Sequence, residues 1–191
     1  MTQSIQSRKE ASHERILQAA TRAIRRSGYA GTGVADIMRE AGLTHGGFYA
    51  HFGSREAMLA EAADRAGGES VAALEQFAAA APSGDAYRTL LKTYLSRAHV
   101  ERVETGCPVA ALGSEMPRQA PEVREAASRR IKDMINLVAC HAPGGDGPER
   151  RRTALATTAT MIGALILARA VDDRQLADDV LAAAFAQLTG E

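Results

Sequence analysis

Apolar positions along the chain recur at helical spacing, and no stretch of usable length alternates with the period of a β-strand. Residues 13–26 carry a first apolar stripe, which stops at Ser27-Gly28-Tyr29. A second stripe follows Thr32, whose hydroxyl we expect to cap that helix, and it ends at Gly42. Thr44 is then placed to cap a third, short helix. Three short helices with facing stripes predict a small bundle whose second and third helices form a helix-turn-helix.

The third predicted helix, between Gly42 and Phe52, is built unlike the other two. It is expected to run for about two turns, and it carries two glycines, two histidines and no carboxylate. A short helix without carboxylates, placed directly after a tight turn, suits insertion into the major groove of DNA. We expect Phe48 and Phe52 to be core residues rather than contacts.

Beyond residue 54 the apolar spacing predicts helices to the end of the chain. Ser54 and Asp85 are expected helix caps, and Pro108 suits the first turn of a helix. The sequence therefore predicts an all-α fold, with an N-terminal helix-turn-helix DNA-binding domain over 1–54 and a second helical domain over 55–191. The helices expected in the second domain span 54–81, 85–98, 122–139, 148–171 and 173 onwards.

Several short motifs between residues 13 and 61 are specific in combination. They are Ile16-Leu17-Gln18-Ala19-Ala20, Gly28-Tyr29, Ile37, Ala41-Gly42-Leu43, Gly46, Phe48-Tyr49-Ala50-His51-Phe52 and Arg55-Glu56-Ala57-Met58-Leu59. Together they resemble the DNA-binding domain of the TetR-type transcriptional regulators. The resemblance implies a ligand-responsive DNA-binding regulator and not an enzyme: a repressor that binds a palindromic operator in double-stranded DNA as a homodimer and is released by a small-molecule effector. It also implies that the second domain is the ligand-binding and dimerisation domain.

The same resemblance implies roles in DNA binding. Tyr49 and His51 match family positions that contact phosphate oxygens, and Arg55 matches one that reaches a phosphate. His45 lies in the first turn of the third helix and is the best candidate for reading a base edge. Gly47 departs from the family pattern, because many members carry a side chain there; two successive glycines predict a close approach of the backbone to DNA. The predicted DNA-binding residues are Thr32, Thr44, His45, Gly46, Gly47, Tyr49, His51 and Arg55.

The formal net charge of the chain is zero, but the charge is uneven. Residues 1–55 hold eight Lys/Arg against four Asp/Glu, or +4, and residues 56–191 hold fifteen against nineteen, or −4. A basic N-terminal third is typical of a DNA-reading domain on a soluble body. We expect Arg8 and Lys9 to follow the DNA backbone as a flexible arm. The outer face of the first helix is expected to carry Arg15, Arg22, Arg25 and Arg26.

Nothing in the sequence predicts export, a membrane span or catalysis. The first residues are polar, and the apolar run 154–168 is shorter than the roughly 20 residues that a bilayer demands. Two cysteines do not make a disulfide framework. The sequence has no phosphate-cradling glycine loop, HExxH, CxxC or nucleophile elbow. We therefore expect a cytoplasmic protein with no membrane partner, no metal, no cofactor and no catalytic residue.

The last two predicted helices carry wide apolar faces mixed with small residues, which suits close packing against a second copy. The resembled family dimerises through its last two helices, while an ordinary intrachain core is the alternative. The predicted dimer-interface residues are Leu155, Ile162, Leu165, Ile166, Val180, Leu181 and Phe185.

The effector is not identified by the sequence. Few charged residues fall on the helical stripes of the second domain, which favours a mostly apolar or aromatic small molecule, although each candidate residue could equally be core. The alternatives are a regulator controlled by thiol modification at Cys107, which stands at a predicted helix start, and a DNA-binding dimer with no inducer. The predicted ligand-binding residues are Tyr87, Leu91, Tyr94, Leu95, Cys107, Met116, Met134, Leu137 and Met161.

Overall fold

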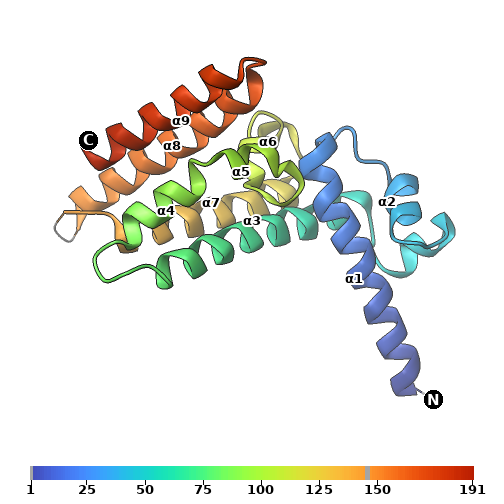
Figure 1. The fold of residues 1–191 in the computed structure, drawn as a ribbon. Coiled ribbons are helices and arrows are strands. Elements are labelled where there is room, and N and C mark those ends of the chain that lie inside the picture. Colours follow the sequence, from blue (N-terminus) through green and yellow to red (C-terminus); the bar gives the residue numbers. More distant parts are fainter. Residues whose placement is uncertain (1, 145–146) are drawn as a thin grey trace.

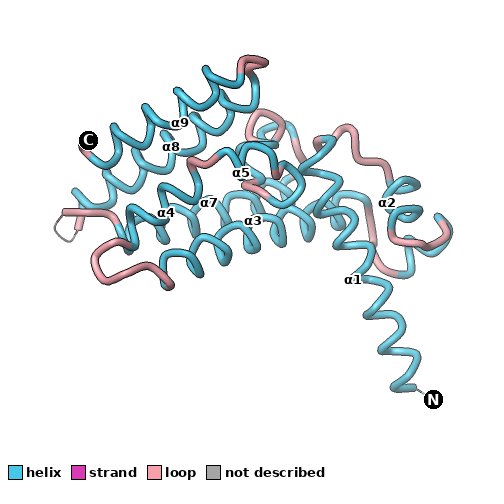
Figure 2. Tube along the Cα trace, viewed as in Figure 1, coloured by secondary structure: helices cyan, strands magenta, loops and turns pink. Residues whose placement is uncertain are grey.

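The computed structural model describes residues 2–144 and 147–191, and within these ranges every regular element is helical (Figure 2). The all-α prediction is therefore confirmed. In chain order the elements are α1 (Thr2–Ser27), α2 (Val34–Glu40), η1 (His45–Ala50), α3 (Arg55–Ala79), α4 (Ala86–Tyr94), α5 (Arg97–Glu101), η2 (Val103–Thr105), α6 (Pro108–Leu112), η3 (Met116–Arg118), α7 (Pro121–His141), α8 (Pro148–Ala170) and α9 (Arg174–Thr189).

The apolar side chains form two clusters, and α3 contributes to both of them. The helix runs from beside α1 into the rest of the bundle, where it packs along α7 (Figure 1). The N-terminal core also takes in Leu112 and Val123, which belong to the second predicted domain. The helix-turn-helix domain is thus joined to the second domain, which we call the body, by a shared apolar core as well as by the covalent chain. The largest members of the N-terminal core are Ile16, Ile24, Tyr29, Ile37, Met38, Phe48 and Phe52; those of the C-terminal core include Leu90, Leu91, Tyr94, Val138, Met161 and Leu165.

The end of α1 is fixed by a glycine and a distant carboxylate. Gly28 has a φ of +75°, in the left-handed region that favours glycine, and an added Cβ would lie 2.3 Å from the Glu115 carboxylate. That carboxylate accepts the backbone N–H groups of Tyr29 at 2.9 Å and Ala30 at 3.3 Å. A residue of the body therefore holds the turn that leads into α2.

The predicted cap at Ser54 is confirmed, because its hydroxyl accepts the N–H of Ala57. At the start of α9 the Asp173 carboxylate accepts the N–H groups of Gln175 and Leu176, a cap that was not predicted. The cap prediction at Thr32 is wrong: Gly33 is the N-cap of α2, because the Thr32 hydroxyl instead donates to the Gly28 carbonyl at 2.6 Å. Thr44 and Asp85 occupy the predicted N-cap positions of η1 and α4, but their side chains make no cap bond.

Arg25 does not lie on the outer face of α1 as predicted. Its side chain is 1% exposed, and its guanidinium donates to the Ala66 carbonyl at 2.7 Å, the Glu104 carbonyl at 2.8 Å and the Glu69 carboxylate at 3.0 Å. These partners lie on α3 and η2, so burial of the charge is offset by bonds that local spacing does not reveal. The segment of Arg8 and Lys9, expected as a flexible arm, is an exposed part of α1, whose N-terminal turns project away from the bundle (Figure 1).

Among the described residues, α8 alone is long and apolar enough to cross a membrane, judged by length and composition. One such helix is weak evidence, because core helices of soluble proteins pass the same test. In the structure α8 packs against α7 and α9 and contributes Ala154, Met161 and Leu165 to the C-terminal core. We therefore assign α8 to the protein interior and not to a bilayer.

Candidate nucleic-acid interface

The turn between α2 and η1 is tight and begins at Gly42. Gly42 has a φ of +67°, and its N–H and that of Leu43 donate to the Arg39 and Met38 carbonyls. The segment after the turn, expected as a two-turn α-helix, is instead a six-residue 3₁₀-helix. Two adjacent glycines weaken helix formation, and a run this short suits the tighter winding. The segment is held in place by Phe48, which is fully buried as predicted and stacks on the equally core-bound Phe52.

The exposed side of η1 is formed by the residues expected to meet DNA. Tyr49 is 74% exposed, which is unusual for an aromatic side chain, and its ring contacts Phe48 edge-on at 5.2 Å between centroids. His45 and Gly46 are also exposed. Because Phe48 anchors the ring of Tyr49, the phenol hydroxyl is presented to solvent at a defined place.

His51 lies at the edge of this surface, beside α1. Its ring centroid is 6.3 Å from that of His13, which stacks on Phe52 and accepts or donates a bond to Glu61 at 2.9 Å. Within the described residues, Nδ1 of His51 has no hydrogen-bond partner although it is buried. Burial, followed by the charges of His13 and Lys9, lowers the pKa of His51, so the ring is neutral near pH 7.

Arg55 and Thr32 stabilise the turn before α2. The Arg55 guanidinium donates to the Thr32 carbonyl at 3.1 Å and 3.3 Å and also to the Tyr29 carbonyl. Thr32 is buried, and its hydroxyl is occupied by Gly28. Of the eight predicted DNA contacts, these two are therefore bonded within the protein, whereas His45, Gly46 and Tyr49 face solvent.

The two glycines of η1 have room for a side chain. An added Cβ at Gly46 meets no atom within 4 Å, and one at Gly47 makes only ordinary contacts with Met38 at 3.7 Å and Thr44 at 3.9 Å. Packing inside the protein therefore does not require glycine at either position. If glycine is required at these positions, the reason is contact with another molecule at the exposed face of η1.

The predicted ligand-binding residues do not gather around one pocket. Met116 packs against the N-terminal core, while the other eight lie in or against the C-terminal core. Cys107 is 1% exposed, and its backbone N–H donates to Nε2 of His99 at 3.0 Å. None of the nine lines the pocket between α3 and α5, which we call the α3–α5 pocket; its lining includes Ser70, Leu74, Phe77, His99, Arg102 and Gly106.

The predicted dimer residues divide between the surface and the interior. Leu165 and Leu181 are buried in the chain's own core, and Ile162, Val180 and Phe185 are half-buried. Leu155 and Ile166 are exposed, and so are Leu167 and Leu176, which the sequence did not single out. An apolar face therefore runs along the outside of α8 and the start of α9.

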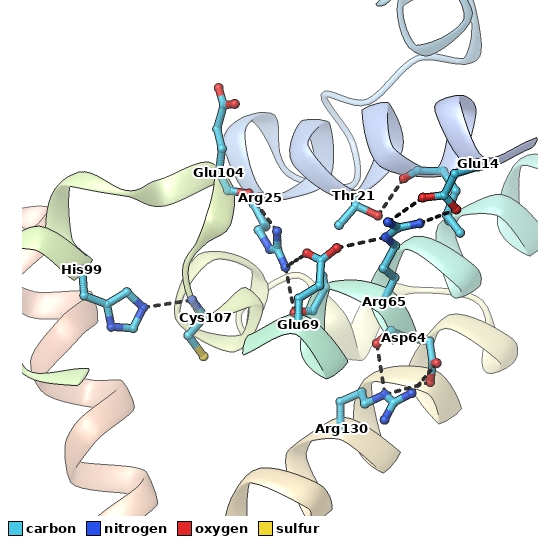
Figure 3. A network of polar contacts seen from close by, with 12 residues as sticks. Glu14, Thr21, Arg25, Asp64, Arg65, Glu69, His99, Glu104, Cys107 and Arg130 are labelled. Carbon is cyan, nitrogen blue, oxygen red and sulfur yellow. Dashed lines mark hydrogen bonds and ion pairs between the residues drawn. The ribbon is translucent and has the colours of Figure 1, made fainter. Parts of the chain in front are cut away.

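Sequence reasoning missed the polar residues that join the helix-turn-helix to the body. Arg25, Glu69, Glu104 and Glu115 lie on separate elements, and no spacing pattern relates them. Figure 3 shows the network around Arg25: Arg65 also bonds Glu14 of α1 and Glu69 of α3, so this network joins α1 and α3 through both arginines. Within the described ranges, the structure groups no three His, Cys, Asp or Glu residues in a manner suited to a metal ion.

Comparisons with known proteins agree with this geometry. Residues 16–62 match the family model for bacterial regulatory proteins of the tetR family, and residues 84–183 match that for the LmrA/YxaF-like transcriptional regulator C-terminal domain. The chain is 29% identical to the HTH-type transcriptional regulator LmrA of Bacillus subtilis (strain 168) over 132 residues, which cover 66% of this chain and 68% of that protein.

Solved structures share the whole fold. A TetR transcriptional regulator from Chloroflexus aurantiacus J-10-FL superimposes with a TM-score of 0.77 at 28% identity, covering 96% of this chain and 95% of that one. Reduced NemR of E. coli has the same fold, with a TM-score of 0.76 at 19% identity over 94% of this chain and 95% of that one. The chain thus belongs to the tetR family of bacterial regulatory proteins and is a DNA-binding transcriptional regulator, not an enzyme.

Proposed function

We propose that the protein is a cytoplasmic repressor that binds a palindromic operator as a homodimer, with one η1 in the major groove of each half-site, and that a small molecule releases it. The observation that carries the DNA-reading part is the outward-facing Tyr49 beside His45 and two glycines on a helix without carboxylates. Such a surface offers hydrogen-bond donors to DNA and repels no phosphate.

The polar residues in and around η1 have separate roles in this proposal. Tyr49 donates its hydroxyl to a phosphate, and His51 donates a ring N–H to a phosphate from the edge of the surface. His45 meets a base edge, because it stands in the first turn of η1 and is exposed. Arg55 and Thr32 act on DNA indirectly, since their bonds fix the turn that positions α2.

The proposed dimer buries the apolar face on the outside of α8 and α9. Leu155, Ile166, Leu167 and Leu176 are each more than two-fifths exposed in the single chain, at 43%, 41%, 56% and 46%. Gly163 lies in line with Ile166 and Leu167 on α8, and an added Cβ there meets nothing within 4 Å. A small residue amid exposed leucine and isoleucine allows two helices to approach closely.

The experiment is a measurement of operator affinity on DNA selected from a randomised pool. Tyr49→Phe should weaken binding about tenfold across operator variants, because a hydrogen bond to a charged phosphate contributes about 1.5 kcal/mol or more. His45→Ala should also change the preference among bases at one position in each half-site. Gln76→Ala, at an exposed site on the far part of α3, is the matched control. Unchanged affinity and preference in the Tyr49→Phe, His45→Ala double variant would remove η1 from the interface.

A second route of control acts through Cys107. Cys107 acts to raise the pKa of both Tyr94 and Arg169, which places its thiol near these two side chains. Because Cys107 is 1% exposed, a reagent reaches it only when the start of α6 opens. N-ethylmaleimide added to the operator complex should then release wild type but not Cys107→Ser. Release of both variants, or of neither, leaves a reversible effector or a regulator without an inducer.

A further inference from the structure

The α3–α5 pocket is a small hollow on the body, next to the joint with the helix-turn-helix. Its volume is about 80 Å³, roughly half that of the engineered 150 Å³ cavity that binds benzene in another protein. One wall is α3, and the other is the segment from His99 to Gly106. Phe77, Arg102 and Thr105 at its rim are exposed, so part of a ligand can extend towards solvent.

Arg102 supplies the only charge among the described residues that line this pocket. Nε of Arg102 donates to the Ala98 carbonyl at 2.9 Å, which fixes the guanidinium at the rim. No carboxylate is among the lining residues that the structure describes, so a cation has no partner there and an anion has one.

The histidine of the pocket is neutral and its tautomer is fixed. The Cys107 backbone N–H can only donate, so Nε2 of His99 accepts it at 3.0 Å, and Nδ1 therefore donates to the Tyr94 carbonyl at 2.8 Å. Burial lowers the pKa of His99 to about 4. His99 adds a wall to the pocket without adding a charge, which leaves Arg102 to select the ligand.

The α3 side of the pocket is apolar apart from Ser70. Leu74 is a buried lining residue, and Phe77, the one aromatic residue of α3, is 51% exposed. A planar apolar body fits against the Phe77 ring, while a carboxylate on that body pairs with Arg102. The two halves of the pocket thus favour one kind of molecule: a small ring or short chain with one negative charge.

The pocket walls are the two elements that Arg25 joins. Arg25 bonds the Glu104 carbonyl, directly before Thr105 and Gly106, and it bonds Glu69, directly before Ser70 (Figure 3). Arg25 itself belongs to the last turns of α1, in the helix-turn-helix. A ligand that spreads the walls therefore pulls the Glu104 carbonyl away from α3 and stretches bonds of a fully buried guanidinium.

We propose that the α3–α5 pocket binds a small organic carboxylate through Arg102 and Phe77, and that its occupancy loosens Arg25 and lowers operator affinity. The proposal rests on the proposed function, because it names the effector class and its site. It differs from the ligand set expected from the sequence, which lies in packed core and not at this pocket.

Binding is tested first without DNA, by calorimetry with sodium benzoate as the probe. Benzoate should bind wild type at least tenfold more tightly than the neutral benzamide, and Arg102→Gln should remove that difference. Ala73→Leu, which places a larger side chain on the pocket wall, should abolish binding, whereas Ala72→Leu, on the neighbouring exposed position, should not. Equal binding of benzoate and benzamide, or undiminished binding in Ala73→Leu, overturns the site.

Coupling is tested on the selected operator. Benzoate at saturation should weaken operator binding by wild type at least tenfold and should leave Arg102→Gln unchanged, while both proteins bind the operator equally without it. Operator binding that is intact but insensitive to bound benzoate overturns this inference alone. Absence of operator binding in wild type without benzoate would instead overturn the proposed function, so the two failures are distinguishable.

Discussion

The carboxylate of Glu115 accepts the backbone N–H of Tyr29 at 2.9 Å, although the two residues lie 86 positions apart in the sequence. The bond crosses from the segment between α6 and η3 to the turn that orients α2. On its other side the same turn is held by Arg55, which binds the Thr32 carbonyl. The position of α2 is therefore set by two side chains of the body and of α3, and not by the turn alone.

Glu115→Ala should destabilise this joint and weaken operator binding together. Two backbone N–H groups lose a charged acceptor, and hydrogen bonds of this kind contribute about 1.5–3 kcal/mol each. Thermal unfolding should show a lower midpoint, and operator affinity should fall by more than the folded fraction explains. Glu125→Ala, an exposed carboxylate on α7, is the control. If both variants behave alike in the two measurements, Glu115 does not position α2.

Gly46→Ala tests whether glycine is required at this position by DNA binding and not by folding of the protein. The structure offers open space for a Cβ, and alanine favours a helix by up to about 1 kcal/mol, so the midpoint of unfolding should stay level or rise. Operator affinity should nevertheless fall at least tenfold if the backbone approaches DNA closely. Gly53→Ala, which also has open space but lies beyond η1, should keep full affinity. Full affinity in Gly46→Ala would show that DNA does not come close at this position.

The apolar face of α8 and α9 should hold the dimer together. Ile166→Asp would bury an unpaired carboxylate between two copies, at a cost of several kcal/mol, and should give a monomer in sedimentation velocity. The chain itself should stay folded, because Ile166 is 41% exposed within one copy. Ala182→Asp, which lies on the side of α9 that faces Arg88 and Lys92, should remain dimeric. A monomeric wild type, or a stable Ile166→Asp dimer, would place the interface elsewhere.

The sequence was sufficient where structure depends on local pattern. Apolar periodicity predicted the buried Phe48 and the long α3, and side-chain chemistry predicted the cap at Ser54. The sequence was not sufficient where one side chain has two possible hydrogen-bond partners. Thr32 can cap a helix or bond backward to Gly28, and the choice depends on the turn that Glu115 and Arg55 hold from far along the chain.

Tertiary placement also decided which polar and apolar residues are hidden. Arg25 flanks the apolar stripe of α1, and its burial depends on carbonyls of Ala66 and Glu104 that no spacing connects to it. Leu165 and Ile166 are adjacent and equally apolar, yet one is in the core and the other is exposed, because α8 packs on α7 and α9 along one face. Apolar periodicity gives the width of the apolar stripe on a helix. It does not give the part of that stripe that a second chain buries.

Acid should destabilise the body through His99. Burial lowers the pKa of this ring to about 4 in the folded protein, against about 6.5 when unfolded. Between these values the unfolded chain binds more protons than the folded one, so stability rises with pH and is lost as pH falls from about 6.5 through 4. The full difference of about 2.5 pKa units corresponds to about 3 kcal/mol. Urea unfolding of wild type at pH 7 and pH 4 should show this loss.

His99→Gln provides the comparison, because glutamine keeps an amide that can donate and accept but does not titrate. The variant should be less stable than wild type at pH 7, where the neutral ring makes both of its bonds, to the Tyr94 carbonyl and the Cys107 N–H. Its own loss between pH 7 and pH 4 should be smaller by about 3 kcal/mol, the share that the ring contributes. If wild type and His99→Gln lose the same stability between pH 7 and pH 4, the pH dependence belongs to other groups. His99 would then contribute to packing alone, and its protonation would not affect the stability of the protein.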